Sequence, residues 1–158
     1  MRYYTSWVSF ELLVTVRHFN IFLVMEINFQ PFTVNKRFPL TISRKTTAQT
    51  TNLWLQIAQE GIEGWGEASP FGVGNYRQTT EQIINTIEQI IPIFQKFSPW
   101  QRQEIESLLE QMQIPSAVKA ALDMALHDWL GKRLGLPLWQ LWGLNKSAIV
   151  PKIGRAHV

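Results

Sequence analysis

Two patterns of hydrophobic and polar positions divide the chain. Up to residue 68, apolar residues fall in short runs that alternate with polar ones, which is typical of β-strands with one buried face. The run "INFQPFTV" predicts a first strand, and "TTNLWLQIA" predicts a second with Leu53, Leu55 and Ile57 on one face. Gly61 then predicts a tight turn into a third strand at 62–68. Three strands joined in this way should form an antiparallel meander.

The segment between the first two strands has a different character. Residues 36–51 are polar and rich in threonine, and they predict a long surface loop. Connecting loops often carry binding or catalytic residues, so this one is a candidate for function.

From Thr79 onward the hydrophobic period becomes helical. One apolar face follows the spacing of an amphipathic helix and consists of Ile83, Ile84, Ile87, Ile90, Ile91 and Phe94. Thr79 and Gln82 have the spacing of a capping box, and Pro92 should kink or end the helix because it has no N–H group. A second helix is predicted with Ser98 as its cap and Pro99 in its first turn. Its inward positions should be Ile105, Leu108, Leu109 and Met112.

Pro115 and Ser116 restart the chain into a third helix. Alanines at i, i+4 and i+8 would let another backbone approach one side of it, namely Ala117, Ala121 and Ala125. Gly135 is a natural C-terminal stop, and "LPLWQLWG" predicts a short apolar helix behind it. Three strands followed by three or four helices indicate an α+β fold, a three-stranded antiparallel meander with a helix bundle.

Composition narrows the class of protein. With 158 residues, 46% hydrophobic and 17% charged, the chain is an ordinary globular domain. The absence of cysteine excludes disulfides and thiolate sites, and it suits a cytoplasmic protein. The net charge of +3 is spread over pairs such as Lys36-Arg37 and Lys132-Arg133, so it does not indicate a nucleic-acid surface.

The first 24 residues are unusually apolar and aromatic. Glu11 and the pair Arg17-His18 interrupt them, which leaves no run of the roughly 20 apolar residues that a membrane-spanning helix needs. No small-x-small cleavage site of a signal peptide follows. We therefore expect no membrane segment, and we interpret residues 1–24 as a non-native upstream extension, with translation beginning at Met25.

No catalytic or metal-binding constellation stands out among the residues themselves. The three histidines, at positions 18, 127 and 157, lack metal-ligand spacing. His127 and Asp128 lie in the middle of a predicted helix, where Asp128 can pair with Lys132, so a structural role is favoured. "GVGNY" has neither the third glycine nor the Gly-Lys of a phosphate loop. On chemistry alone the chain would not be assigned to an enzyme class.

Two motifs taken together point to a family. "EGIEGWGEASPF", followed by amphipathic helices and then "SAVKAALDMALHDWLGKRLGLPLWQLWG", resembles the N-terminal capping domain of the enolase superfamily. Within it, the chain is most similar to the mandelate racemase/muconate lactonizing enzyme-like group, particularly its dipeptide (L-Ala-D/L-Glu) epimerases. The resemblance covers residues from about 25 to 150 and implies a capping domain at 25–145.

The resemblance also implies where the chemistry lies. In this family a (β/α)-barrel that follows the cap holds Mg²⁺ on three acidic residues and carries lysines that move a proton next to a carboxylate. None of these residues is present, so we expect no catalytic residue and no metal ligand in this chain. Residues 146–152 would be the start of a truncated barrel. We expect 153–158 to be an artefact, because "IGRAHV" is a common sequencing adapter read as codons.

The resemblance implies that the capping domain determines substrate specificity through two loops. In the first, Arg44 and Thr46 of "LTISRKTT" would contact the substrate, with Arg44 on a carboxylate of an acidic dipeptide such as Ala-Glu. In the second, Phe71 and Gly72 would approach it, while Glu67 would fix the end of the strand before them. The alternatives are a solvated Arg44 and a Phe71 that anchors the core of the meander.

The parent enzyme implied by the resemblance is a Mg²⁺-dependent isomerase in the cytoplasm, which acts on a dipeptide and possesses its own barrel domain. Full-length subunits of such an enzyme could form a homo-oligomer. Muconate cycloisomerase and o-succinylbenzoate synthase remain as enzymatic alternatives. A different class is a non-catalytic domain that binds a partner through its tryptophans and the "LPLWQLWG" helix.

Overall fold

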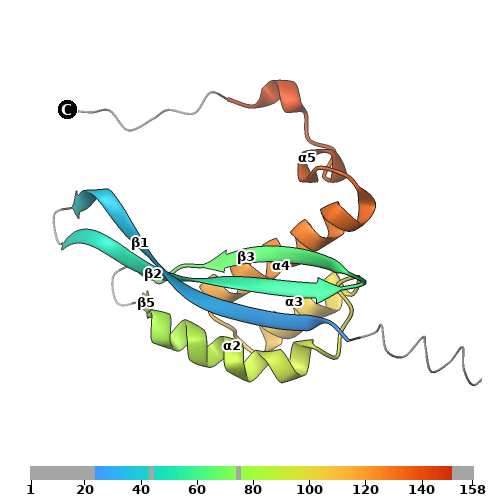
Figure 1. Cartoon of the computed structure of the whole chain (residues 1–158), viewed down its shortest axis with the longest axis horizontal. Coiled ribbons are helices and arrows are strands. Elements are labelled where there is room, and N and C mark those ends of the chain that lie inside the picture. The colour runs from blue at the N-terminus through green and yellow to red at the C-terminus, as the bar shows by residue number, and fades with distance from the viewer. Residues whose placement is uncertain (1–23, 43–44, 74–75, 151–158) are drawn as a thin grey trace, which may run out of the picture.

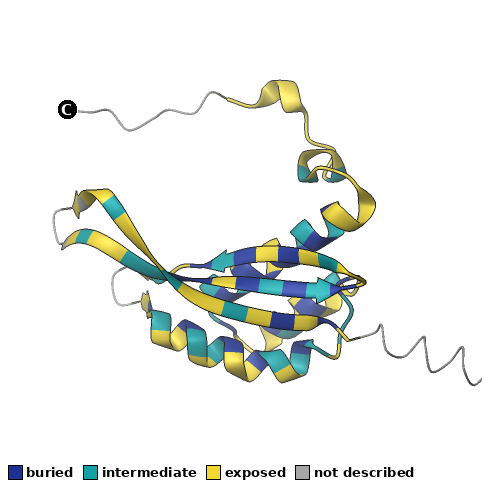
Figure 2. Ribbon diagram, in the orientation of Figure 1, coloured by how far each residue is buried: buried dark blue, intermediate teal, exposed yellow. Residues whose placement is uncertain are grey.

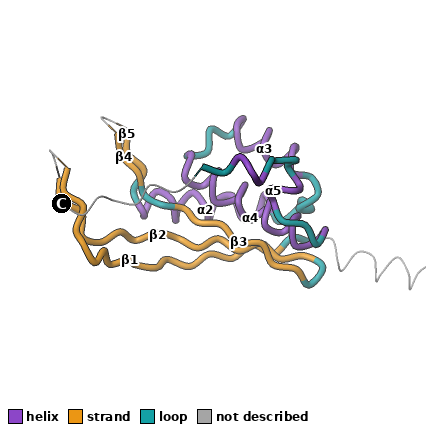
Figure 3. The backbone as a smooth tube through the Cα atoms, turned by 90° about the horizontal axis from the view of Figure 1, so that it is seen from above, coloured by secondary structure: helices purple, strands orange, loops and turns teal. Residues whose placement is uncertain are grey.

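A computed structural model describes residues 24–42, 45–73 and 76–150. A three-stranded antiparallel sheet in the order β1-β2-β3 forms one layer of the molecule, and helices form the other (Figures 1 and 3). The strands of this sheet are β1 (Glu26–Ile42), β2 (Lys45–Gln59) and β3 (Ile62–Ala68). A small antiparallel hairpin follows, made of β4 (Phe71–Val73) and β5 (Tyr76–Gln78).

The helical layer follows the strands in the chain. Its elements are α2 (Thr80–Phe94), α3 (Arg102–Gln111), α4 (Ser116–Leu134), α5 (Leu138–Leu141) and the 3₁₀ helix η1 (Lys146–Ala148). Buried positions gather where the sheet and the helices meet, whereas the far half of the β1–β2 hairpin and the segment after α4 are mostly exposed (Figure 2). The predicted α+β class and the meander followed by helices are confirmed, whereas the β4–β5 hairpin between them was not predicted.

The predicted loop at 36–51 is wrong for the part that the structure describes. Strands β1 and β2 run through most of it and pair as far as Ile42 and Lys45, with a register shift between Asn35 and Leu40. Threonine favours strands because its β-branched side chain suits a pleated surface. Cross-strand hydroxyl pairs contribute as well: the Oγ1 atoms of Thr33 and Thr51 are 3.0 Å apart.

The turn between β2 and β3 is as tight as the sequence predicts. Glu60 and Gly61 both have positive φ, at 56° and 72°, and they link the paired residues Gln59 and Ile62. Positive φ at both central residues is the geometry of the hairpin turns that match the twist of a sheet.

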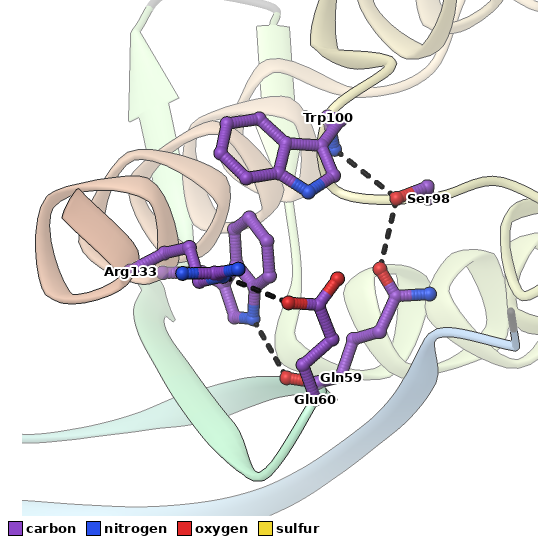
Figure 4. A network of polar contacts seen from close by, with 6 residues as sticks. Gln59, Glu60, Ser98, Trp100 and Arg133 are labelled. Atoms are coloured by element: carbon purple, nitrogen blue, oxygen red, sulfur yellow. Dashed lines mark hydrogen bonds and ion pairs between the residues drawn. The ribbon is translucent and has the colours of Figure 1, made fainter. Parts of the chain in front are cut away.

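A polar network surrounds this turn (Figure 4). Trp129 Nε1 of α4 donates to the Gln59 carbonyl at 3.2 Å, and Arg133 Nε donates to Glu60 Oε2 at 2.7 Å. The hydroxyl of Ser98 donates to Gln59 Oε1 at 2.8 Å. The rings of Trp100 and Trp129 meet edge to face with their centroids 5.2 Å apart. The network therefore joins the sheet, α4 and the segment before α3 at one end of the molecule.

Helix α4 lies directly on the sheet because small residues meet there. A Cβ atom added to Gly66 would lie 1.9 Å from the Ala121 carbonyl oxygen, and one added to Gly64 would lie 2.1 Å from that of Ala125. Ala121 and Ala125 are fully buried, so the predicted close approach of another backbone is confirmed for these two alanines. One hydrophobic cluster, contained within residues 25–129, includes the buried aliphatic and aromatic side chains that the structure describes. This part of the chain thus has a core of its own.

The helix ends support most of the predictions and correct two of them. The capping box is formed, and Gly135 ends α4 with φ 66°. Pro92 lies in the last turn of α2, which ends two residues later. Ser98 does not cap α3, because that helix begins at Arg102 and the Ser98 hydroxyl is engaged by Gln59 instead. Met112 follows α3 and is exposed, not inward.

Replacing Thr79 with alanine should cost about 1 kcal/mol of unfolding free energy, since it removes the side-chain acceptor of the Gln82 N–H at 3.2 Å. Urea unfolding followed by circular dichroism measures this change. The matched control is Ser107→Ala, which removes a hydroxyl from an exposed position within α3 and should change stability little. Equal stability of the two variants would contradict the capping role.

Candidate functional site

The two segments that carry the candidate substrate residues lie at the same end of the molecule. Figures 1 and 3 both show the far half of the β1–β2 hairpin and the β4–β5 hairpin on the side opposite the β2–β3 turn. Arg44 lies outside the described residues. Thr46 is exposed, and its Oγ1 is 3.1 Å from that of Thr41 on the neighbouring strand. One candidate of the first segment is therefore placed, on a strand and not on a loop.

The β4–β5 hairpin separates the other two candidates. Phe71 pairs with Gln78, and Gly72 pairs with Arg77. Successive residues of a strand face opposite sides, so Phe71 and Gly72 belong to different faces of this two-stranded ribbon. Phe71 is 55% exposed, and the alternative that it anchors the core is therefore wrong.

A buried amide side chain holds the start of the segment that carries this hairpin. Asn52 on β2 is only 8% exposed, and it donates through Nδ2 to Glu67 Oε1 at 2.5 Å. Its Oδ1 accepts a hydrogen bond from the Ser69 hydroxyl at 3.1 Å. Glu67 therefore fixes the end of β3, which is the role that the sequence predicts for it.

A second buried amide holds the end of the same segment. Gln78 is 4% exposed, and its Nε2 donates to Ser116 Oγ at 2.9 Å and to the hydroxyl of Tyr76. Its Oε1 accepts from the Ala117 N–H at 2.9 Å. Helix α4 begins at Ser116, and its N-cap residue Pro115 offers no side-chain cap, so Gln78 provides an acceptor for the helix N-terminus from outside the helix.

Removing the Gln78 side chain should therefore act on both the hairpin and α4. We expect Gln78→Ala to cost about 1–3 kcal/mol, because the Ala117 N–H and the Ser116 hydroxyl lose a buried partner. It should also speed trypsin cleavage after the adjacent Arg77. The control is Gln103→Ala at an exposed position of α3. Cleavage after Arg77 at the native rate in a destabilised Gln78→Ala variant would show that Gln78 does not hold the hairpin.

Two polar side chains of α4 that the sequence brings into question have structural partners. Asp128 binds Lys132 Nζ at 2.6 Å, as predicted, and also accepts the Trp65 N–H of edge strand β3 at 2.9 Å. His127 Nδ1 lies 2.9 Å from the Asp123 carbonyl oxygen, one turn earlier in the same helix. Within residues 24–42, 45–73 and 76–150, no group of three or more histidine, aspartate or glutamate residues could hold a metal ion. No helix of that part of the chain is long and apolar enough to cross a membrane.

A half-open groove of about 220 Å³ lies between α3 and α4. Ile105, Leu109 and Leu126 contribute to its apolar lining. Ion pairs cross it from Arg102 to Asp123 at 3.7 Å and from Lys119 to Glu110 at 2.6 Å. None of the candidate residues lines this groove.

An antiparallel meander followed by helices is the fold of the N-terminal capping domains of the enolase superfamily. The model of the mandelate racemase/muconate lactonizing enzyme N-terminal domain matches residues 25–143. The chain belongs to this family.

Its relatives include several epimerases. The L-Ala-D/L-Glu epimerase of Bacteroides thetaiotaomicron is 35% identical over 126 residues, which cover 78% of this chain and 32% of that protein. A hydrophobic dipeptide epimerase from a Flavobacteria bacterium is 37% identical over 123 residues, or 77% and 34% of the two chains. The dipeptide epimerase of Enterococcus faecalis, solved with Mg and L-Leu-L-Tyr, has a TM-score of 0.69 and 25% identity over 75% of this chain and 34% of its own.

An o-succinylbenzoate synthase is also related. That of Listeria innocua is 30% identical over 100 residues, which cover 62% of this chain and 26% of that protein. The chain thus spans about a third of the length, or less, of the relatives that it matches.

Proposed function

We propose that residues 25–145 are the substrate-specificity cap of a dipeptide epimerase, an isomerase that exchanges the proton next to a carboxylate. The observation that carries the proposal is the identity of 35–37% with two epimerases, over 126 and 123 residues. The geometry supports it, because two hairpins stand at one end of the sheet and one of them is fixed at both ends by buried amides.

The catalytic part of such an enzyme lies outside the residues described. Mg accompanies the dipeptide in the Enterococcus structure, but the described residues do not fit a metal site. Magnesium would therefore be held by a barrel domain. Residues 146–152 would lead into that barrel. This chain's own residues would bind the dipeptide, orient it and keep water from the reacting carbon. The proposed enzyme would lie in the cytoplasm, which the absence of cysteine supports. Its full-length subunits would assemble into a homo-oligomer.

Arg44 is the first residue that we assign to substrate binding, with Thr46 beside it. A guanidinium can hold a carboxylate through two parallel hydrogen bonds, which a lysine cannot do. Residues 36–51 contain four cations and no acidic residue, so a carboxylate approaching this segment meets no charge of its own sign within it. The preferred substrate would then be a dipeptide with an acidic side chain, such as Ala-Glu.

A chimera tests the proposal. Residues 25–143 replace the matching segment of the Bacteroides relative, and α-proton exchange is followed by NMR in D₂O with Mg²⁺ and a panel of dipeptides. We expect turnover of L-Ala-L-Glu. We expect Arg44→Ala to lower kcat/KM for this substrate about 10–100-fold, the size of one charged hydrogen bond, and to spare L-Ala-L-Leu.

Lys96→Ala is the matched control, since it removes an exposed cation just beyond the C-terminal end of α2. A folded chimera that processes no dipeptide would overturn the epimerase proposal. Turnover of the o-succinylbenzoate synthase substrate in place of dipeptides would favour that alternative, which the Listeria relative supports.

A further inference from the structure

One face of the three-stranded sheet points away from the helices. Helices α2 and α4 contact the sheet on its other face, and Figures 1 and 3 show no described helix over this one. Leu53, Leu55 and Ile57 of β2 point toward the helices and are fully buried. Because side chains alternate along a strand, Trp54 and Gln56 point the opposite way. We call this side the outer face, formed by the even-numbered positions of 26–36 and 52–58 and the odd-numbered positions of 63–67.

Aromatic side chains lie at the centre of the outer face. Trp54 stacks on Phe32 of the neighbouring strand, with ring centroids 4.7 Å apart and an angle of 11° between the ring planes. Trp65 on β3 pairs with Gln56, the next outward residue of β2 after Trp54. The two indoles are 40% and 42% exposed. Large aromatic side chains left open to water on three adjacent strands are typical of a surface that another molecule covers.

Charged side chains lie at the two ends of the outer face. Glu26 and Glu63 are exposed at one end, where both pair with Ala58. Lys36 lies at the other end of the outward row of β1. Neither Glu26 nor Lys36 has an ion-pair partner within the part of the chain that the structure describes. The sequence has no lysine or arginine in 26–35, 46–59 or 62–68, so the face is acidic at one end and basic at the other.

This distribution of charge is complementary to itself. Two copies related by a two-fold axis that crosses the strands would meet with their outer faces together and their strands reversed. Glu26 of each copy then faces Lys36 of its partner. The axis passes between Gln30 and Phe32, which flank the midpoint of this row. Gln30 pairs with Trp54, so the stacked rings lie beside the axis. Face-to-face packing of two sheets is a common way to bury such a surface.

We propose that the outer face is a homodimer interface, in which two copies of this chain pack their sheets together with the strands antiparallel. Phe32 and Trp54 would form its buried centre. The Glu26–Lys36 pairs would set the orientation of the two copies. The inference names a surface for the subunit assembly proposed above and rests on that part of the proposal, but not on the epimerase activity.

Sedimentation velocity of the full chain over a range of concentrations tests the proposal. We expect a monomer–dimer equilibrium. Glu26→Lys or Lys36→Glu alone should weaken dimerisation about tenfold or more, because each places like charges opposite one another. The double variant Glu26→Lys/Lys36→Glu exchanges the two charges and should restore the dimer affinity to within about threefold.

A second pair of variants tests the centre of the interface. Trp54→Ala should weaken dimerisation at least about tenfold, since a buried tryptophan is a typical hot spot. The matched control is Trp142→Ala, which removes an exposed indole from the segment after α4 and should leave dimerisation unchanged. Urea unfolding of each variant shows that it is folded.

The outcomes separate this inference from the epimerase function. A chain that stays monomeric would overturn the interface, and so would a dimer weakened by Trp142→Ala but not by Trp54→Ala. Loss of the dimer in the single charge variants without recovery in the double variant would also overturn it. The epimerase function would stand in all three cases, because turnover by the chimera tests it. A chimera without turnover, beside a chain that dimerises as expected, would leave the interface standing and the epimerase function wrong.

Discussion

Replacing Gly66 with alanine is expected to cost at least about 3 kcal/mol of unfolding free energy. The added Cβ would lie 1.9 Å from the Ala121 carbonyl oxygen and 2.8 Å from its carbon. Both are backbone atoms of α4, so no side chain can rotate to make room. The helix must move away from the sheet, and close packing across the core would be lost with it. For a domain of ordinary stability this is a large fraction of the total.

Urea unfolding of Gly66→Ala measures the loss. The matched control is Gly143→Ala, where an added Cβ meets nothing within 4 Å and only the backbone conformation, at φ 63°, resists the change. That control should cost about 1 kcal/mol. If the two variants unfold at the same urea concentration, α4 does not lie on β3 as described.

Replacing Trp129 with alanine is the second change with a large expected effect, about 3–5 kcal/mol. The indole is fully buried, meets Trp100 of the segment before α3, and donates from Nε1 to the Gln59 carbonyl of the sheet at 3.2 Å. Alanine would leave a cavity and remove the edge-to-face contact with Trp100. It would also leave the Gln59 carbonyl without this donor.

Two further variants separate the contribution of the Nε1 donor from that of the buried ring. Trp129→Phe keeps most of the ring volume but removes the Nε1 donor, so it should cost less than alanine and more than a surface change. Trp142→Ala removes an indole that is 52% exposed and should change the urea midpoint little. Equal effects of Trp129→Ala and Trp142→Ala would contradict the placement of Trp129 in the core.

Local signals in the sequence predict much of this fold. The Thr79 and Gln82 capping box, the glycine after α4 and the apolar face of α2 each depend on neighbours within one or two helical turns. The alanines of α4 also predict close packing, although not against which partner. The glycines at 64 and 66 supply that partner, because β3 brings them under Ala125 and Ala121.

The far half of the β1–β2 hairpin could not be predicted in this way. It extends beyond the core, so its residues need no alternation of apolar and polar side chains, and its threonines suit a loop and a strand alike. The misplaced start of α3 has a similar origin, since Ser98 is a good cap by type but its hydroxyl is taken by Gln59, 39 residues earlier in the chain. Tertiary contacts outweigh local preference at both places.

The candidate site likewise contains residues that local motifs identify and residues that only tertiary contacts reveal. Arg44, Thr46, Phe71 and Gly72 could be selected from motifs, and they remain predictions for substrate contact. Asn52 and Gln78 escaped the sequence analysis because their partners are distant along the chain. One local signal could still identify such a residue in another sequence, namely a polar residue directly before a capping box, as Gln78 is before Thr79.

Sequencing the source DNA downstream of the Ser116 codon, over at least about 700 bases, tests most directly whether this domain caps a catalytic barrel. We predict that the reading frame continues past the Lys152 codon into alternating strands and helices, with a Lys-x-Lys motif and acidic residues at the ends of successive strands. A stop codon directly after the Val158 codon in the source DNA would contradict the proposal for this chain and direct the search to a binding partner.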